Sequence, residues 1–584
     1  MNRRIRLTAV LAVSALGLAA TGAVAASGSG KDTEADYTPI ERFDPLAASS
    51  PCVGAGSGRD SNPFVLPERS DEDDTSGYDQ VVVAEEGQGG TEDLWDMNTQ
   101  NEFGKDAGRF VFRTHEVGAA AANDPPRAPG GAQVTVTDLE EDDTEVLAER
   151  NDWERFDGIV WTPYGTILAA EETVVQNQLD PNAPQARGGL VYEFYVDRKD
   201  PSKLDPRREP QGTVTRDDDG TSDVTRDGIR VRPALGAKSH EGMRFDRRGN
   251  HYGIAETRGR TTANQTGGIF RFIPEEKNEQ GPLARGQLQA FDSPNGQDGQ
   301  GRWVDLNRTR SQEDADAEAE RQGANEYQRP EDVETGESTG RDRNNGGNTL
   351  YVALTEGEDE GVLALDLSRK DRPFAYDYVG KQAGNASEPD FDSPDNLALD
   401  RKGNLAITED PGGVPPTKQM GDDIFIASPP SGDDDDDEGG KRRQPADEVE
   451  RFASIKDCNA EPTGIYFALE GTEKFTEDNE DLKELVTDES LFVNRQHSGQ
   501  NTDRDQFVSI APVEEEDEDQ EGDDEEQDEK GSGSGSEAEQ PGSGSSTGSD
   551  DSTDADPSTD ADPSTDGGSS TDTGSSTDTG TATR

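Results

Sequence analysis

The sequence predicts an all-β fold of the β-propeller type, with acidic loop insertions and a disordered C-terminal tail. The first observation is a strand–turn–strand unit that recurs at long, irregular intervals, which is typical of propeller blades. The cores of three such units read FDGIVWTPYGTILAAEE, HEGMRFDRRGNHYGIAE and PDNLALDRKGNLAITED. The second observation is that residues 105–510 show almost no sustained apolar period of 3.6 residues, which argues against a helical domain.

The three units share one spacing of polar residues. In each, a glycine follows the turn position after three residues and an acid follows it after ten; the turn positions are Thr162, Asp246 and Asp400. Five residues before each turn position stands another acid: Asp157, Glu241 and Asp395. Equivalent positions of propeller blades lie at equal radius around the central channel, so these acids would form a ring. Converging carboxylates repel one another unless cations bind between them or some of them take up protons.

Three further segments match this unit less closely. RPEDV places Glu331 at the start of a strand, and the strand NTLYVALTE follows it. EPTGIYF places Thr463 at the same point, with LFVNRQH following after an insertion, and THEV with Glu116 is a candidate sixth unit. The candidate metal ligands are the acids at the two ends of these strand pairs: Asp157, Glu171, Glu172, Glu241, Glu256, Glu331, Asp395, Asp410 and Glu116. The alternative interpretation is that these acids only form turns or solvated strand ends.

Further strands are predicted at 109–113 and 133–139, in TEVLAER, and in GGLVYEFYV and GGIFRFIP, which suit the outer strands of blades. The segment 313–322, EDADAEAERQ, has helical propensity but is polar on all sides, so we expect a helix in a surface insertion. Acidic insertions at 205–228, 310–347 and 429–450 are predicted to be mobile loops.

The two ends of the chain differ in composition from its middle. Residues 1–26 carry a basic start, an apolar run and small residues before a cleavage site, as a secretory signal peptide does. Residues 27–107 are a polar N-terminal extended segment, and 108–511 hold the predicted propeller. Residues 512–584 are rich in Asp, Glu, Ser, Thr and Gly and have too few apolar residues, without any periodic pattern, to form a core. We therefore expect a secreted protein, extracellular or associated with the cell wall.

Net charge and hydropathy exclude some classes of binding partner. The net charge of −69 argues against nucleic acid and anionic membranes, and no second apolar run is long enough to insert into a membrane. We expect a monomer that acts on small molecules.

Two cysteines remain in an exported chain, Cys52 and Cys458, and an even pair in an oxidising compartment predicts a disulfide between them.

Seven motifs in order make the chain similar to a known family. TPYGTILAAEE, HEGMRFD, GGIFRFIP, RPED, VALT, PDNLALDRKGNL and LFVNRQHSG resemble the PhoX family of secreted alkaline phosphatases, over about residues 108–499. The resemblance implies a six-bladed propeller with a central cluster of calcium and iron that hydrolyses phosphate monoesters. The family's Arg-Pro-Glu motif matches Arg329, Pro330 and Glu331, and its His-Glu-Gly motif matches the segment that begins at His240.

The chain departs from the family pattern, which indicates a divergent member. Asp157 stands where members with an iron centre have a cysteine, and the family's Gln-His-Pro-Gly is Gln-His-Ser-Gly here, with His497 as its histidine. A carboxylate is a harder ligand than a thiolate, so the sequence favours several calcium ions over iron. The candidate catalytic residues are Arg329, whose planar guanidinium suits phosphate oxygens, and His240 and His497 as ligands or proton donors. Each could instead be structural, Arg329 through an ion pair with a neighbouring acid.

Three functions remain open on the sequence alone. The first is a secreted, metal-dependent phosphoric-ester hydrolase acting on small phosphate esters at a site in the central channel. The second is a non-catalytic, calcium-stabilised extracellular propeller. The third is a lactonase-like propeller hydrolase.

Overall fold

A computed structural model describes the following residues: 43–52, 61–67, 77–91, 93–117, 131–150, 153–173, 183, 185–186, 189–210, 227–257, 267–275, 281–293, 299–335, 348–356, 360–369, 371–380, 391–411, 418–430, 443–497 and 504–513. All of them lie in Met1–Glu518, the first of two units into which the chain divides. The predicted signal peptide and nearly all of the predicted tail therefore fall outside the described residues.

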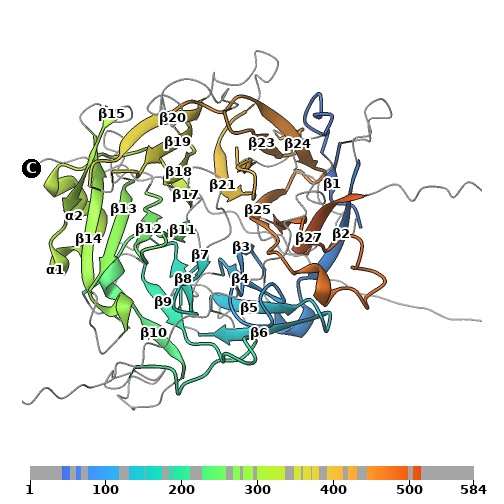
Figure 1. Ribbon diagram of the computed structural model, residues 1–584, viewed down its shortest axis with the longest axis horizontal. Helices are drawn as coiled ribbons and strands as arrows, with labels where there is room; N and C mark the ends of the chain where they lie inside the picture. The colour runs from blue at the N-terminus through green and yellow to red at the C-terminus, as the bar shows by residue number, and fades with distance from the viewer. Residues whose placement is uncertain are drawn as a thin grey trace, which may run out of the picture. The chain divides into compact units, whose positions relative to one another are not determined.

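Six antiparallel sheets of four or five strands surround a common centre, which is a six-bladed β-propeller (Figure 1). Going round the ring, each innermost strand contacts the next, and the last contacts the first. The innermost strands are β3 (Trp95–Gln100), β7 (Phe156–Trp161), β11 (Met243–Phe245), β17 (Pro330–Thr335), β21 (Pro394–Leu399) and β25 (Ala460–Phe467). Both the all-β class and the six-bladed arrangement predicted above are confirmed.

The other strands follow outward in each blade. The first blade adds β4 (Phe110–His115), β5 (Gln133–Asp138) and β6 (Asp143–Glu149), and the second adds β8 (Ile167–Glu171), β9 (Val191–Phe194) and β10 (Ile229–Val231). The third adds β12 (His251–Ile254), β13 (Ile269–Pro274), β14 (Gly286–Asp292) and β16 (Arg302–Asp305). The fourth adds β18 (Thr349–Leu354), β19 (Gly361–Asp366), β20 (Phe374–Gly380) and β15 (Gly299–Gln300). The fifth adds β22 (Leu405–Glu409), β23 (Asp423–Ala427), β24 (Val449–Ile455) and β1 (Phe64–Val65), and the sixth adds β26 (Leu491–His497), β27 (Gln506–Val513) and β2 (Gly77–Glu85).

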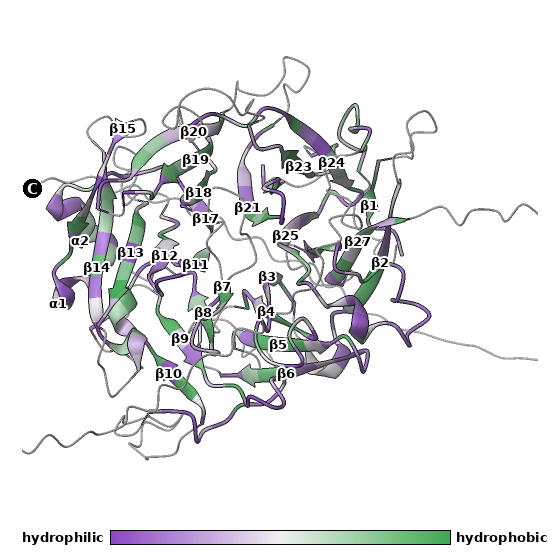
Figure 2. Cartoon of the chain, in the orientation of Figure 1, coloured by the Kyte–Doolittle hydropathy of each residue, from purple (hydrophilic) through white to green (hydrophobic). Residues whose placement is uncertain are grey.

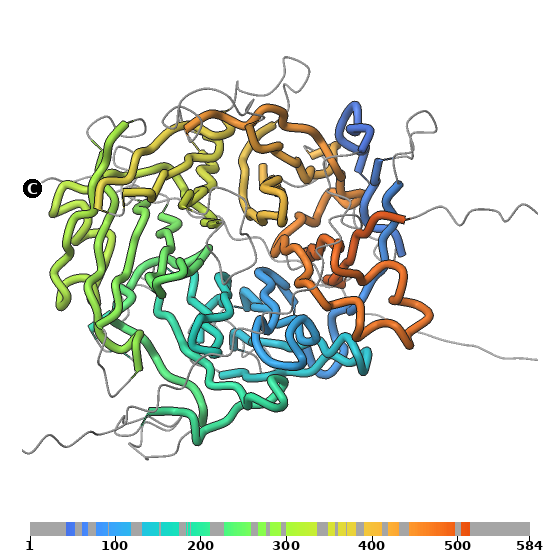
Figure 3. The backbone as a smooth tube through the Cα atoms, viewed as in Figure 1, coloured from blue at the N-terminus to red at the C-terminus, as the bar shows by residue number. Residues whose placement is uncertain are grey.

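Strands from the N-terminal part of the chain complete the last two blades. β1 pairs with β24 and β2 pairs with β27, so blue N-terminal segments lie beside orange and red C-terminal ones (Figure 3). The innermost strand of the first blade, β3, also precedes residue 108. The segment 27–107, expected to be extended, thus supplies three strands to the propeller. A disulfide between Cys52 and Cys458, with Cα atoms 5.0 Å apart, ties this N-terminal part to the last blade.

The hydrophobic core lies between neighbouring sheets rather than in one central mass. Green apolar stretches alternate with purple ones along the strands, while the outer loops are largely purple (Figure 2). One cluster between the first two blades contains the fully buried rings of Trp153, Phe156 and Tyr192. Because apolar residues fill the space between blades, polar side chains at the inner ends of the strands are left to line the centre.

Two helices lie between β16 and β17: α1 (Arg308–Ser311) and α2 (Ala315–Gln322). The predicted helix at 313–322 is therefore present, but it is not a simple surface insertion. Ala315 and Ala319 of α2 are buried among residues of the third blade, because these small side chains give the helix one close-packing face. Short 3-10 turns occur at Gln88–Gly90, Pro233–Leu235, Pro282–Ala284 and Glu473–Phe475. In the described part of the chain, none of the helices has the length and apolar character needed to cross a membrane.

Candidate metal centre

In four of the six blades, a repeated irregularity of the backbone turns one acid toward the centre. Between the innermost strand and its neighbour, the pairing register shifts at Trp95/Asn98, Phe156/Ile159, Pro330/Val333 and Pro394/Leu397. The first of the two residues that each shift encloses is an acid: Asp96, Asp157, Glu331 or Asp395. A bulge of this kind redirects a side chain out of the alternation of the strand. The acids at these positions are therefore placed by the backbone and are not simply turn residues.

The residue two places before each of these acids has a left-handed backbone. Leu94, Arg155, Arg329 and Ser393 have φ values of 57°, 45°, 47° and 47°. Non-glycine residues adopt this conformation at a cost, so it persists only where the surrounding structure enforces it. The carbonyl groups of these residues accept hydrogen bonds from the N–H groups at the ends of the second strands, at 2.8–3.0 Å, from Glu116, Glu172, Thr355 and Asp410 respectively. The same hydrogen bond therefore fixes an inner acid and the end of the second strand in each of these four blades, and in three of them that end residue is also an acid.

Neighbouring blades meet directly behind the inner acids. A Cβ on Gly158 would lie 1.9 Å from the carbonyl oxygen of Glu241, and one on Gly242 would lie 1.8 Å from Oδ1 of Asp332. In the fourth blade the residue after the inner acid is Asp332 instead of glycine, and its side chain forms a hydrogen bond to the next blade. Oδ2 of Asp332 accepts the Leu397 N–H at 2.9 Å. The sequence pattern of an acid followed by Gly, Asn or Asp thus combines a side chain in the channel with a residue that fits against the next blade.

The acids of all six blades converge on one small cavity of about 50 Å³. Its lining contains ten carboxylates: Asp96, Glu116, Asp157, Glu172, Glu241, Glu256, Glu331, Asp395, Asp410 and Glu461. Among the described residues, the remaining lining side chains are Arg329, Asn396 and Thr463. Ten acids around one arginine leave a large excess of negative charge in a poorly hydrated space.

Eight of the nine candidate metal ligands line this cavity, and Glu171 does not. The carboxylate of Glu171 accepts the Glu154 N–H at 3.1 Å and the Leu190 N–H at 3.0 Å. Its neighbour Glu172, one residue beyond β8, lines the cavity in its place. Strand alternation explains the difference, since adjacent residues point in opposite directions. Glu116 also lines the cavity, but from the end of a second strand rather than from the start of an innermost one.

Two lining acids were not among the predicted ligands. Asp96 occupies in β3 the position that Asp157 occupies in β7, and Glu461 lies two residues before Thr463. The segment WDMN does carry an acid at the expected point, but Met97 stands where the other units have Gly, Asn or Asp after the acid. The Pro-Thr-Gly motif drew attention to Thr463, whose hydroxyl donates to the Trp95 carbonyl at 2.9 Å and closes the ring between the last and first blades.

Arg329 is the cation of the cavity. Its Nε lies 2.9 Å from Oε1 of Glu256, its Nη2 lies 3.4 Å from Oδ2 of Asp410, and it also pairs with Glu331. Burial alone would lower the pKa of Arg329, but the attraction of Glu331 and Glu256 outweighs burial and raises it. The guanidinium therefore stays charged. Its ion pairs also account for the structural alternative stated for this residue, since Arg329 bridges three blades.

Several carboxylates of the cavity have raised pKa values and so resist ionisation. Burial raises the pKa of Glu331 to about 8. Burial and then the charge of Glu116 raise the pKa of Asp157 well above its ordinary value, and the pKa of Glu172 is raised by burial and then by a hydrogen bond with Glu256. Such shifts mean that the fully ionised cluster is unstable without positive charge beside it. Cations would supply that charge, and protons are the alternative.

Comparison with known proteins identifies the family. The family model "Alkaline phosphatase PhoX" matches residues 158–475, which is more than half of the chain. The chain belongs to the PhoX alkaline phosphatase family. None of the curated proteins matches it in sequence.

Solved structures show similar folds at low identity. PhoX of Pseudomonas fluorescens, in complex with the transition state analogue vanadate, is 17% identical; the match covers 80% of this chain and 98% of that one, with a TM-score of 0.49. The gluconolactonase XC5397 of Xanthomonas campestris is 11% identical over 81% and 100% of the two chains, with a TM-score of 0.35.

PhoX proteins are metal-dependent, and the cavity of this member fits hard cations. Within each of two groups, carboxylate oxygens lie within 4.8 Å of one another: Asp96 with Glu116 and Asp157, and Glu241 with Glu256 and Glu331. Oδ1 of Asp157 is buried and has no hydrogen-bond partner among the described residues. Oxygen-only ligand sets are those of calcium and magnesium. Both cysteines of the chain are in the disulfide, so the PhoX cavity here contains no thiolate for a softer metal.

Of the two predicted catalytic histidines, His240 does not line the described PhoX cavity. The ring of His240 is fully buried, with Nδ1 2.8 Å from Nζ of Lys238 and Nε2 3.1 Å from the carbonyl oxygen of Gly236. Burial, followed by the charge of Lys238, lowers the pKa of His240 well below its ordinary value. These contacts indicate a packing role for His240 outside the cavity that its neighbour Glu241 lines. His497 ends β26, and its side chain lies outside the described residues.

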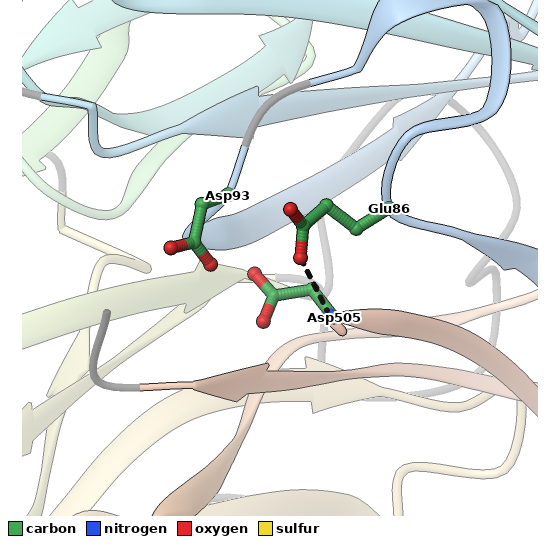
Figure 4. Close-up of side chains that lie close together, drawn as sticks. All are labelled: Glu86, Asp93 and Asp505. Carbon is green, nitrogen blue, oxygen red and sulfur yellow. Dashed lines mark hydrogen bonds between the residues drawn. The ribbon is translucent and has the colours of Figure 1, made fainter. Parts of the chain in front are cut away.

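A second group of acids lies apart from the cavity, between β2, β3 and β27. Figure 4 shows Glu86, Asp93 and Asp505 with their carboxylates facing one another. Asp505 uses its backbone N–H to donate to Oε2 of Glu86 at 3.4 Å, and its own Oδ2 accepts the Trp95 N–H at 2.7 Å. These bonds hold the C-terminal strand to the first blade, which is a sufficient structural role.

Proposed function

We propose that this PhoX-family member is a secreted, metal-dependent phosphatase that hydrolyses small phosphate esters at the central cavity. The single observation that carries the proposal is the convergence of ten carboxylates, six of them buried and four partly buried, around one arginine. A purely structural centre would be more stable with apolar residues in these positions. A predicted export signal and a disulfide, which persists in oxidising compartments, support an extracytoplasmic location.

The carboxylates would hold the cations, with Asp96, Glu116 and Asp157 as one ligand group and Glu241, Glu256 and Glu331 as another. Bound divalent cations would neutralise the oxygens of the ester and withdraw charge from phosphorus. We propose calcium as the main cation, because every ligand available in the cavity is an oxygen.

Arg329 would bind the phosphoryl oxygens through its planar fork of N–H donors. Charge on these oxygens changes as the bond to the leaving group breaks, and a fixed cation there stabilises the transition state. The ion pairs with Glu256 and Asp410 orient the guanidinium in advance, so little reorganisation accompanies the reaction. A volume of about 50 Å³ admits the phosphoryl end of an ester and leaves the leaving group at the mouth.

The test is hydrolysis of an aryl phosphate by the purified protein, with its metal content measured alongside. Chelation should abolish activity and calcium should restore it. Arg329→Ala should lower kcat by roughly 10²-fold or more, as the loss of other transition-state donors does. Arg302→Ala is the matched control, since Arg302 is 68% exposed and pairs only with Asp292 in the described structure.

Two outcomes would separate the alternatives. If the calcium-loaded protein hydrolyses no phosphate ester but is stabilised by calcium, the non-catalytic propeller takes the place of the enzyme. If it hydrolyses lactones and no phosphate ester, the lactonase-like function does.

A further inference from the structure

Arg155 occupies in the second blade the position that Arg329 occupies in the fourth. Each stands two residues before a channel acid, Asp157 or Glu331, and the two φ values are 45° and 47°. The carbonyl of each accepts the N–H of the second-strand end residue of its own blade. Equivalent positions of propeller blades direct their side chains to the same radius. The fold therefore places Arg155 and Arg329 at equivalent positions around the same end of the central channel.

The two arginines differ in depth. The side chain of Arg329 is 15% exposed and lines the cavity, whereas that of Arg155 is 53% exposed. Nη1 of Arg155 lies 3.5 Å from Oε2 of Glu172, and Glu172 lines the cavity. Arg155 is therefore at the mouth, where its guanidinium has water on one side and a cavity acid on the other.

A line of contacts joins the two guanidinium groups. Arg155 contacts Glu172, Glu172 shares a hydrogen bond with Glu256, and Glu256 accepts from Nε of Arg329 at 2.9 Å. A molecule that reaches from the cavity past this carboxylate pair would have Arg329 at its inner end and Arg155 beyond it. The other residues at this backbone position, Leu94 and Ser393, carry no charge, so the mouth is asymmetric.

We propose that Arg155 is a specificity-determining residue that binds a second anionic group on the leaving-group side of the substrate. This inference rests on the proposed phosphatase function and names its substrate class: phosphate esters that carry a further carboxylate or phosphate. A cavity that admits only the phosphoryl end places the leaving group at the mouth, within reach of Arg155. The surrounding chain has a net charge of −69, so a cation at this point gives an anionic ester an attraction that a neutral ester lacks.

The experiment uses two esters of closely similar shape, 4-carboxyphenyl phosphate and 4-carbamoylphenyl phosphate, which differ by one charge. The calcium-loaded full chain should have the higher kcat/KM on the carboxylate ester. Arg155→Gln should lower the ratio of the two kcat/KM values by about fivefold, the upper range for a partly exposed ion pair. The loss should lie in KM for the carboxylate ester, and Arg155→Lys should recover part of it. Arg302→Gln is the charge-matched control and should leave the ratio unchanged.

Binding of the matching benzylphosphonates, which cannot be hydrolysed, gives a readout that does not depend on activity. Calorimetry should show that the wild type prefers the 4-carboxy compound and that Arg155→Gln loses this preference. An unchanged ratio and unchanged preference in Arg155→Gln would overturn the inference while leaving the phosphatase intact. Equal loss on both esters would also overturn it, because that would indicate a structural role. If the wild type hydrolyses neither ester, the phosphatase proposal fails, and the phosphonate preference still decides the role of Arg155.

Discussion

Removing divalent cations should make the stability of this protein fall steeply as pH rises. Burial raises the pKa of Glu331 from 4.5 to about 8, and the pKa values of Asp157 and Asp395 are raised in the same direction, again mainly by burial. A carboxyl group with a higher pKa in the folded state binds its proton more tightly there than in the unfolded chain. Stability is therefore greatest at low pH and is lost as pH rises from the unfolded pKa through the folded one. For Glu331 this window runs from pH 4.5 to about 8.

The size of the effect follows from the width of this window. A difference of about 3.5 pH units at about 1.4 kcal/mol per unit gives a loss on the order of 5 kcal/mol from Glu331 alone at pH 8. The unfolding entropy of a domain of about 400 residues is roughly 0.8 kcal/mol/K, so this loss corresponds to about 6 °C in Tm. Other acids of the cavity add to it, while bound cations would remove most of it by favouring the ionised carboxylates.

The assay is calorimetric melting from pH 4.5 to pH 8, in chelator and in excess calcium. The gain in Tm from calcium should grow by at least about 6 °C across this range. Glu331→Gln should reduce that growth, because the amide does not titrate, while Glu145→Gln on the exposed edge strand β6 should not. A gain in Tm that is constant or that shrinks toward pH 8 would refute the assignment of this cavity as a cation site.

Three further substitutions probe the site and its frame. Asp96→Asn should lower the calcium content measured by mass spectrometry, with Glu145→Asn as a control, and full occupancy in the variant would remove Asp96 from the ligand set. Gly158→Ala should cost about 1–3 kcal/mol in chemical denaturation, because its Cβ would meet a backbone carbonyl at 1.9 Å; an unchanged midpoint would show that the blades can separate there. Paired Cys52→Ser and Cys458→Ser replacements should cost about 2–4 kcal/mol, and two free thiols in the denatured, unreduced wild type would contradict the disulfide.

The sequence by itself determined the fold class and most of the acids that meet in the centre. Strand–turn–strand units with an acid at a fixed offset are local patterns, and local patterns can be recognised without the rest of the chain. Asp157, Glu241 and Asp395 follow from this offset, and Glu331 follows from the looser match of the segment RPEDV. The resemblance to PhoX implied six blades and indicated Arg329 as a catalytic candidate. The spacing pattern of the acids does not by itself give either.

Only the tertiary structure decided which strands close the ring. β1, β2 and β3 pair or pack with strands that lie hundreds of residues away, and such partners leave no periodic signal in a polar, glycine-rich segment. Asp96 was overlooked for this reason. The same limit applies to side-chain direction: Glu171 and Glu172 are adjacent, and the pairing of β8 with β7 fixes which one faces the cavity.

The tertiary structure also separated the roles of the charged residues. His240 belongs to the His-Glu-Gly motif, but its ring packs against Lys238 and does not line the cavity. Arg155 follows no motif, yet it reaches the mouth because the second blade repeats the left-handed backbone of Arg329. Sequence spacing fixes where a residue stands along a blade, whereas the bulges and the contacts between blades fix where its side chain points.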